Sequence, residues 1–258
     1  MIGIIGVGNM GTAIAGRLQK NGLEVIAKGR KMISISGVKE ASGFDEMARC
    51  KAVLLCVKPA DLSSVASGMK VAISSTGGHP LLISIAAGRS LQWLEGHLGN
   101  ERIVRAMPNL AARAGKSFTC FSANSNASSE DLELAQEIFS TFGSCRQVSE
   151  GSLNAVTAIS GSGLAYFLYF ARALAKAGVS AGLEGGLADL LARSTLIGVS
   201  AIADEATPST FDELIASIAT PGGTTEAALG VFEQNGMEKT VSSAVHAAKE
   251  RCEALAQK

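Results

Sequence analysis

The stretch MIGIIGVGNMG, Met1–Gly11, decides the fold of this chain. Its apolar run, Ile2–Ile5, predicts a buried strand, and the glycine pattern GxGxxG follows directly. An amphipathic helical pattern then covers Thr12–Asn21. A strand, a glycine turn and a helix in this order are typical of the first half of a dinucleotide-binding βαβ unit. An ordinary glycine-rich turn is the alternative, but the flanking strand and helix favour a cofactor site.

Each glycine of this turn has a separate physical task. Gly6 permits the tight turn, Gly8 leaves room for a diphosphate, and Gly11 lets the helix pack closely on its strand. The free N–H groups and the dipole at the start of the helix attract the same diphosphate. The predicted diphosphate site is the whole turn: Gly6, Val7, Gly8, Asn9, Met10 and Gly11.

Two cations follow the second predicted strand, Leu23–Ala27. An NAD site has an acidic residue at this place, which binds the ribose 2′-hydroxyl. This chain has Lys28-Gly29-Arg30-Lys31 instead. Cations here can hold a 2′-phosphate, so Lys28 and Arg30 favour NADPH as the cofactor and leave NADH as a weaker option. A solvated basic turn is the alternative interpretation.

The composition excludes several classes of protein. The chain has 258 residues, of which 47% are hydrophobic and 18% charged, so it can bury a core. Its 23 basic and 23 acidic residues balance, which argues against a nucleic acid or a membrane surface as partner. We expect neither a signal peptide nor a membrane span, because the first residues already form a strand and polar residues interrupt the apolar helices.

The cysteines and histidines indicate a reducing compartment. The five cysteines are scattered without a CxxC pair, and the three histidines are not spaced as metal ligands. We therefore expect free thiols, no metal site and a cytoplasmic location.

Strand and helix patterns alternate up to about residue 149 and then give way to helices alone. The further predicted strands are 52–57, 81–85, 102–107, 118–121 and 145–148, with helices at 45–50, 61–72, 90–98 and 129–142. The later helices are predicted at 151–177, 183–205, 211–217, 224–235 and 237–257. This change predicts an α/β Rossmann-type domain over 1–149, followed by an all-α domain over 150–258.

The predicted helix Leu183–Glu205 is apolar on nearly every face. A helical domain of this size has little capacity to bury such a helix alone. The pattern predicts a homodimer formed through the C-terminal domain, with assembly of dimers into a higher oligomer left open.

Two further places have the composition of ligand sites. The buried strands end in Cys56–Pro59, Ile85–Gly88 and Pro108-Asn109, at the sheet edge where ligands bind. Later, Thr220–Thr225 places a proline, two glycines and free hydroxyls at a helix start, which suits a small carboxylate. A capped turn between helices is the alternative for this second place.

Six ordered motifs give the chain a family resemblance. GVGNMG, CVKP, ISIAAG, VRAMPN, AVTAISGSGLAY and ATPGGTTEAAL occur in an order that resembles pyrroline-5-carboxylate reductase, from residue 1 to about 250. The resemblance implies a Rossmann domain, a helical domain that interlocks with a second subunit, and reduction of L-Δ1-pyrroline-5-carboxylate to L-proline by NAD(P)H.

The resemblance also implies residue roles. Lys28 to Arg30 would bind the adenosine ribose or its phosphate. The nicotinamide and its ribose would be flanked by Cys56, Val57, Lys58, Pro59, Ile85, Ala86 and Ala87, and Asn109 would help order that edge. Glu150 matches an acid that contacts the substrate. Gly223, Thr224 and Thr225 would hold the substrate carboxylate, and the Thr225 hydroxyl would lie close to the imine nitrogen as the catalytic group.

The chain departs from the family pattern at Leu110-Ala111, Leu164, Ser217 and Thr220, where Thr-Pro, proline, asparagine and serine are usual. The alternatives are a related cyclic-imine reductase, a β-hydroxyacid dehydrogenase and a non-catalytic NADP-binding protein. The dehydrogenase needs a lysine shortly after Gly161-Ser162-Gly163, and the next lysine here is Lys176, more than three turns away.

Overall fold

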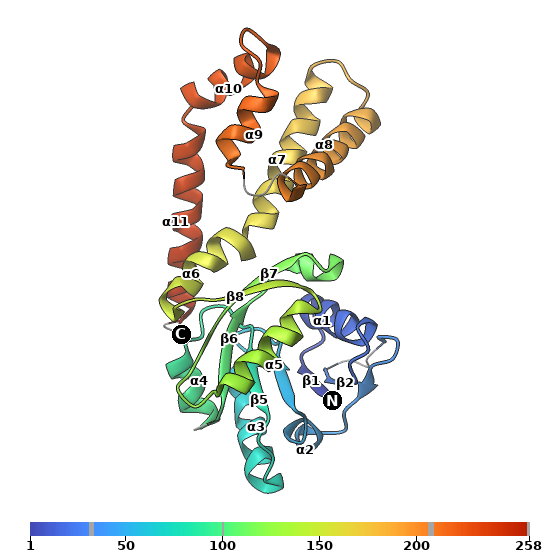
Figure 1. Ribbon diagram of the computed structural model, residues 1–258, viewed down its shortest axis with the longest axis vertical. Helices are drawn as coiled ribbons and strands as arrows, with labels where there is room; N and C mark the ends of the chain where they lie inside the picture. Colours follow the sequence, from blue (N-terminus) through green and yellow to red (C-terminus); the bar gives the residue numbers. More distant parts are fainter. Residues whose placement is uncertain (31–33, 100, 206–208, 257–258) are drawn as a thin grey trace. The chain divides into compact units, whose positions relative to one another are not determined.

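A computed structural model describes residues 1–30, 34–99, 101–205 and 209–256, and in these ranges the N-terminal half forms a mixed sheet (Figure 1). Its order is β3-β2-β1-β4-β5-β6-β7-β8. The strands from β3 to β6 are parallel, β7 is antiparallel to β6, and β8 is parallel to β7. The strands are β1 (Ile2–Ile5), β2 (Val25–Lys28), β3 (Lys39–Glu40), β4 (Ala52–Leu55), β5 (Leu81–Ser84), β6 (Ile103–Met107), β7 (Ser117–Ala123) and β8 (Gly143–Gln147).

Helices cover both faces of this sheet, as Figure 1 shows. The helices α1 (Asn9–Lys20) and α5 (Ser129–Ser140) share one core with the sheet. On the other face α2 (Phe44–Ala48), α3 (Leu62–Thr76) and α4 (Leu91–Leu98) make a second core. In β4, Leu54 packs into the first core and Val53 and Leu55 into the second. This explains the unbroken apolar run in the sequence, since both faces of the strand are buried.

The strand order reverses between β1 and β4, because β2 lies on one side of β1 and β4 on the other. In doubly wound sheets the crevice at such a reversal binds the ligand, beyond the carboxyl ends of the strands. The Rossmann-type fold class expected from the sequence is thereby confirmed. The short strand β3 was not predicted, since its two exposed residues, Lys39 and Glu40, carry no apolar pattern.

The predicted helix 151–177 is interrupted in the structure. A 3₁₀ turn, Glu150–Ser152, leads to α6 (Leu153–Val156) and to a π-helical turn, Thr157–Gly161, before α7 (Gly163–Ser180) begins. Two closely spaced glycines, Gly161 and Gly163, disfavour a continuous α-helix at this place.

The chain forms two compact units. The first contains residues 1–162 together with 247–258, and the second contains residues 163–246. The second unit holds α7, α8 (Gly185–Glu205), α9 (Phe211–Ile218), α10 (Thr224–Gln234) and the first half of α11 (Met237–Ala256). Within it α7 packs along α8, and the rings of Phe170 and Phe232 meet edge to face 6.0 Å apart.

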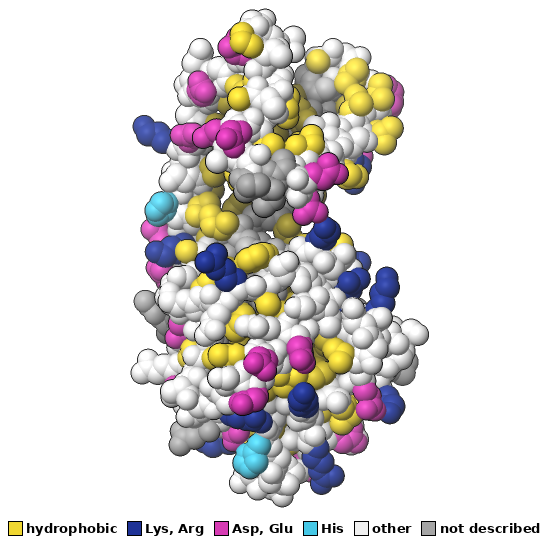
Figure 2. Space-filling view, in the orientation of Figure 1, with side chains coloured by type: hydrophobic (Ala, Val, Ile, Leu, Met, Phe, Trp, Pro, Cys, Tyr) yellow, Lys and Arg dark blue, Asp and Glu magenta, His cyan; other side chains and the backbone are white. Residues whose placement is uncertain are grey.

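The second unit leaves many large apolar side chains uncovered, as the upper part of Figure 2 shows. Phe167 on α7 is 66% exposed and Ile197 on α8 is 71% exposed. By length and composition alone, Glu150–Ser180 and α8 could each cross a membrane, which is weak evidence because buried helices of soluble proteins pass the same test. Apolar surface of this extent marks a contact with another molecule or phase.

Candidate cofactor and substrate sites

The glycine turn has the geometry that its sequence predicts. Gly6 has φ +98°, a conformation that side chains rarely adopt, and a methyl group on Gly11 would collide with the Gly6 carbonyl. A methyl group on Gly8 would have no atom within 4 Å, so this side of the turn is open. The turn therefore has room for a diphosphate to approach the backbone.

The start of α1 carries positive potential that no side chain of its own first turn neutralises. Its first turn has no acidic residue, and its N-cap, Gly8, has no side chain to accept a hydrogen bond. Among the described residues, no acceptor binds the backbone N–H groups of Asn9 and Met10. Free N–H groups at a helix start bind anions, so this end of α1 fits a diphosphate.

A cavity of about 630 Å³ joins three of the predicted cofactor segments. It is lined by the glycine turn, by the basic turn after β2 and by the end of β4, together with Phe44 and the first part of α3. The lining residues that were predicted are Gly6, Val7, Gly8, Lys28, Arg30, Cys56, Val57 and Lys58. A cavity of this size suits part of a bound dinucleotide.

The two predicted cations are held at this cavity in different ways. The Lys28 ammonium lies 5.5 Å from the centre of the Phe44 ring. Arg30 forms an exposed ion pair with Asp61, another lining residue, at 3.3 Å. Asp61 was missed by the sequence analysis, because nothing local to it indicates a contact with Arg30.

The ends of β4 and β5 lie side by side. The Ile85 backbone N–H donates to Leu55 O, at 3.3 Å, and Ala86 is buried. Burial raises the pKa of the Cys56 thiol to about 12, so this side chain is uncharged at neutral pH. Pro59 and Lys58 form the turn that starts α3, since Asp61 N–H donates to Lys58 O.

Asn109, which follows β6, makes three hydrogen bonds through its backbone N–H and its side-chain amide. Its Oδ1 accepts from Ala111 N–H at 3.1 Å, and its Nδ2 donates to Ser160 Oγ at 3.0 Å. Its backbone N–H donates to Ser117 Oγ at 3.0 Å. These bonds hold the loop that follows β6.

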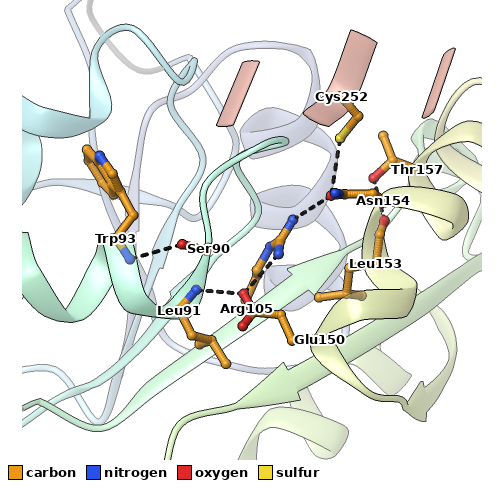
Figure 3. A network of polar contacts seen from close by, with 9 residues as sticks. All are labelled: Ser90, Leu91, Trp93, Arg105, Glu150, Leu153, Asn154, Thr157 and Cys252. Carbon is orange, nitrogen blue, oxygen red and sulfur yellow. Dashed lines mark hydrogen bonds and ion pairs between the residues drawn. The ribbon is translucent and has the colours of Figure 1, made fainter. Parts of the chain in front are cut away.

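Glu150 is the centre of a partly buried polar network (Figure 3). Its Oε1 accepts from Arg105 Nη1 at 2.9 Å and from the Leu91 N–H at the start of α4 at 2.7 Å. Arg105 also donates to Asn154 Oδ1, which accepts from the Cys252 thiol on α11. The Arg105 side chain is only 6% exposed. The sequence analysis did not single out Arg105, although a charged residue inside an apolar strand could have signalled it.

The predicted carboxylate cradle lies in the second unit, at the start of α10. Gly222 has φ +73°, and the Gly223 N–H donates to Thr220 O to close the turn. No described residue accepts from the backbone N–H groups of Thr224 and Thr225, and the Thr225 hydroxyl makes no hydrogen bond within the described chain. The Glu226 carboxylate binds the Gly222 N–H at 2.7 Å, which places one negative charge beside the turn.

The structure thus gathers the predicted cofactor residues and Glu150 in the first unit, and Gly223, Thr224 and Thr225 in the second. In the described ranges, no group of three His, Cys, Asp or Glu side chains could hold a metal ion. All five cysteines are free thiols.

Comparison with known proteins covers both parts of the chain. Residues 150–255 match the family model described as pyrroline-5-carboxylate reductase dimerisation. Residues 1–88 match the model described as NADP oxidoreductase coenzyme F420-dependent.

Several known proteins are similar to this chain over nearly its whole length. The chain is 33% identical to a pyrroline-5-carboxylate reductase of Mycobacterium leprae, covering 98% of this chain and 96% of that protein. It also resembles the crystal structure of Plasmodium falciparum pyrroline carboxylate reductase with NADP bound, at a TM-score of 0.88 and 31% identity, covering 99% and 97% of the two chains. The pyrroline-5-carboxylate reductase of Coxiella burnetii gives a TM-score of 0.90 at 31% identity, covering 100% and 98%.

Proposed function

This chain belongs to the pyrroline-5-carboxylate reductase family, and we propose that it reduces L-Δ1-pyrroline-5-carboxylate to L-proline with NADPH. The observation that carries the proposal is the cofactor cavity, which joins the open glycine turn to two cations. The chain also matches 96% of the length of the Mycobacterium leprae enzyme. NADH remains the weaker cofactor, because no acidic residue follows β2 to bind a ribose 2′-hydroxyl.

The chain's own residues are assigned to the cofactor as follows. The N–H groups of the glycine turn and of α1 bind the diphosphate, and Lys28 and Arg30 bind the adenosine ribose with its 2′-phosphate. The nicotinamide end lies along the carboxyl edges of β4, β5 and β6, against Cys56–Pro59, Ile85–Ala87 and Asn109. The Cys56 thiol and the Ala86 methyl group present uncharged atoms to this end.

The substrate is assigned to the turn before α10. The free N–H groups of Thr224 and Thr225, with Gly223, receive the substrate carboxylate, and the Thr225 hydroxyl holds the ring nitrogen. When bound, NADPH would supply a hydride to the imine carbon of the ring, and the ring nitrogen would carry the added proton. Such a reaction needs positioning and a fixed dipole more than a strong acid, so a hydroxyl suffices. Glu150, held by Arg105, is assigned to the same substrate.

These assignments require the cofactor crevice and the turn before α10 to meet in one cleft, within one chain or between two. We infer a homodimer built through residues 150–258, in which the exposed apolar faces of α7 and α8 cover one another. On this proposal those two helices pack in the dimer and do not cross a membrane. Dimers can assemble further, and the five free thiols fit the cytoplasm.

The test is oxidation of NADPH by the purified protein, followed with and without L-Δ1-pyrroline-5-carboxylate. The proposal requires substrate-dependent oxidation with proline as the product. Activity only with a different cyclic imine would identify a related imine reductase, and activity only with a β-hydroxyacid and NADP would identify a dehydrogenase. Binding of NADPH without oxidation of any of these would identify a non-catalytic protein.

A further inference from the structure

The motif AVTAISGSGLAY has no role in the assignments above, yet its centre has an unusual conformation. Thr157–Gly161 forms a π-helical turn, closed by a hydrogen bond from the Ser162 N–H to Thr157 O at 2.9 Å. Turns of this kind are rare and occur most often at functional sites. We therefore consider which side chain of this turn is positioned to contact a ligand.

The turn lies at the carboxyl edge of the sheet, beyond β6. A methyl group built on Gly161 would be 3.8 Å from the sulfur of Met107, the last residue of β6. Met107 and Leu153 share a small buried cluster, and Ala87 from the loop after β5 packs against it. The π turn is therefore beside the loop after β6, and Met107 links it to the cluster against which Ala87 packs.

Ser160 is the side chain that the turn presents to this edge, and its proton has a defined role. The Ser160 Oγ accepts a hydrogen bond from Asn109 Nδ2 at 3.0 Å. The Asn109 amide cannot exchange the positions of Oδ1 and Nδ2 without losing a hydrogen bond, because its Oδ1 already accepts from the Ala111 N–H. Ser160 must therefore use its own proton elsewhere, and among the described residues no acceptor takes it. A half-buried hydroxyl is thus held in place with a free proton to donate.

We propose that Ser160 donates this proton in a hydrogen bond to the nicotinamide half of the bound cofactor, at an oxygen of the carboxamide or of its ribose. In a doubly wound sheet, the first βαβ half binds the adenosine and the second half binds the nicotinamide. Ser160 stands at the second half, hydrogen-bonded to Asn109 in the loop after β6. Asn109 is then a positioning residue, which acts on the cofactor through Ser160. This inference rests on the cofactor assigned above.

The experiment compares two ligands that share the adenosine half. Dissociation constants for NADPH and for 2′,5′-ADP, which lacks the nicotinamide half, are measured by calorimetry on the full chain and on Ser160→Ala. We expect Ser160→Ala to weaken NADPH binding by about three- to tenfold, as for one lost hydrogen bond, and to leave 2′,5′-ADP binding unchanged. Ser160→Thr, which keeps a hydroxyl, restores the NADPH affinity.

The matched control is Ser162→Ala, two residues along the same turn, whose hydroxyl makes no hydrogen bond within the described residues. It leaves both dissociation constants at the values of the unsubstituted chain. Unchanged NADPH binding in Ser160→Ala overturns the inference, and so does an equal loss of both ligands, which would indicate a disturbed fold. If the unsubstituted chain binds neither ligand, the cofactor assignment itself is wrong, and that result is distinct from the other two.

Discussion

Arg30 and Asp61 form an ion pair at the cofactor cavity, with 3.3 Å between Arg30 Nη2 and Asp61 Oδ2. The residues are 31 positions apart, one in the turn after β2 and the other at the start of α3. The guanidinium that is assigned to the 2′-phosphate of NADPH therefore already has a carboxylate partner. A bound phosphate and Asp61 compete for the same cation, and their negative charges repel.

This relationship predicts how Asp61 tunes the choice of cofactor. Asp61→Asn should strengthen NADPH binding by a few-fold and change NADH binding little, because only NADPH carries the 2′-phosphate. The effect stays small, since the ion pair is exposed and screened by salt. Dissociation constants of both cofactors, measured at two salt concentrations, check it.

The control for this prediction is Arg30→Ala, which should weaken NADPH more than NADH. In the Arg30→Ala background, Asp61→Asn should lose most of its effect on NADPH. Equal effects of Asp61→Asn on the two cofactors would show that Asp61 does not act on the phosphate.

Thr225 is predicted to act on the chemical step. Thr225→Ala should lower kcat/KM by about 10- to 10³-fold, since one hydrogen bond made in the transition state is worth roughly 1.5–4 kcal/mol. Steady-state kinetics with L-Δ1-pyrroline-5-carboxylate measure the loss, and Thr225→Ser should recover most of the rate. Unchanged kinetics in Thr225→Ala would show that the Thr225 hydroxyl has no role in the reaction.

Glu150 is predicted to stabilise the first unit. Glu150→Gln keeps an acceptor for the Leu91 N–H but removes the charge that faces the buried Arg105. The free energy of unfolding should fall by about 1–3 kcal/mol, because a buried guanidinium loses its counter-charge. Denaturant titration measures this change.

Kinetics on the same variant separate the structural role of Glu150 from its assigned contact with the substrate. If the carboxylate contacts the substrate, Glu150→Gln raises the KM for L-Δ1-pyrroline-5-carboxylate more than the KM for NADPH. Equal KM values in the variant and the unsubstituted chain would leave Glu150 with the structural role alone.

Cys56 is predicted to resist alkylation in the folded protein. Burial raises the pKa of its thiol to about 12, and that of Cys50 to about 11, from an ordinary value of 9.0. At pH 8 roughly one Cys56 in ten thousand is a thiolate, which is the form that reacts. Iodoacetamide with mass spectrometry should leave Cys56 unmodified in the native protein and label it after denaturation.

The raised pKa of Cys56 also predicts the direction in which the stability of the protein changes with pH. Because the folded state raises the pKa of Cys56, its contribution to stability is complete below pH 9 and is lost as the pH rises towards 12. Cys56→Ala should therefore show a smaller loss of stability over this range than the unsubstituted chain. If Cys56→Ala and the unsubstituted chain lose the same stability over this range, groups other than Cys56 cause the loss.

The exposed face of α8 is predicted to be a subunit interface. Ile197→Glu combined with Leu190→Glu places two charges on side chains that are 71% and 60% exposed in the single chain. Light scattering at micromolar concentration should give a dimer mass, or a multiple of it, for the unsubstituted chain and a monomer mass for this variant. Val71→Glu on α3, at a side chain 69% exposed, is the control and should keep the assembly. A monomer mass for the unsubstituted chain would contradict the proposed dimer.

Much of the fold could be predicted because its signals are local. The strand Ile2–Ile5 was placed at its observed ends, and β4 began where its apolar run begins. Helix ends were less certain: α1 starts at Asn9, inside the glycine turn, and not at Thr12. The π turn in residues 157–161 could not be predicted, since it depends on packing against Met107 as much as on its own glycines.

The sequence by itself determined the sheet, the glycine turn and the basic turn after β2, because apolar periodicity and glycine spacing act over a few neighbouring residues. Only the tertiary structure decided which side chains are paired. Arg105 meets Glu150 across 45 residues, and Asn109 meets Ser160 across 51. Such contacts leave no periodic pattern, since they arise where separate loops are brought to one edge of the sheet by the order of its strands.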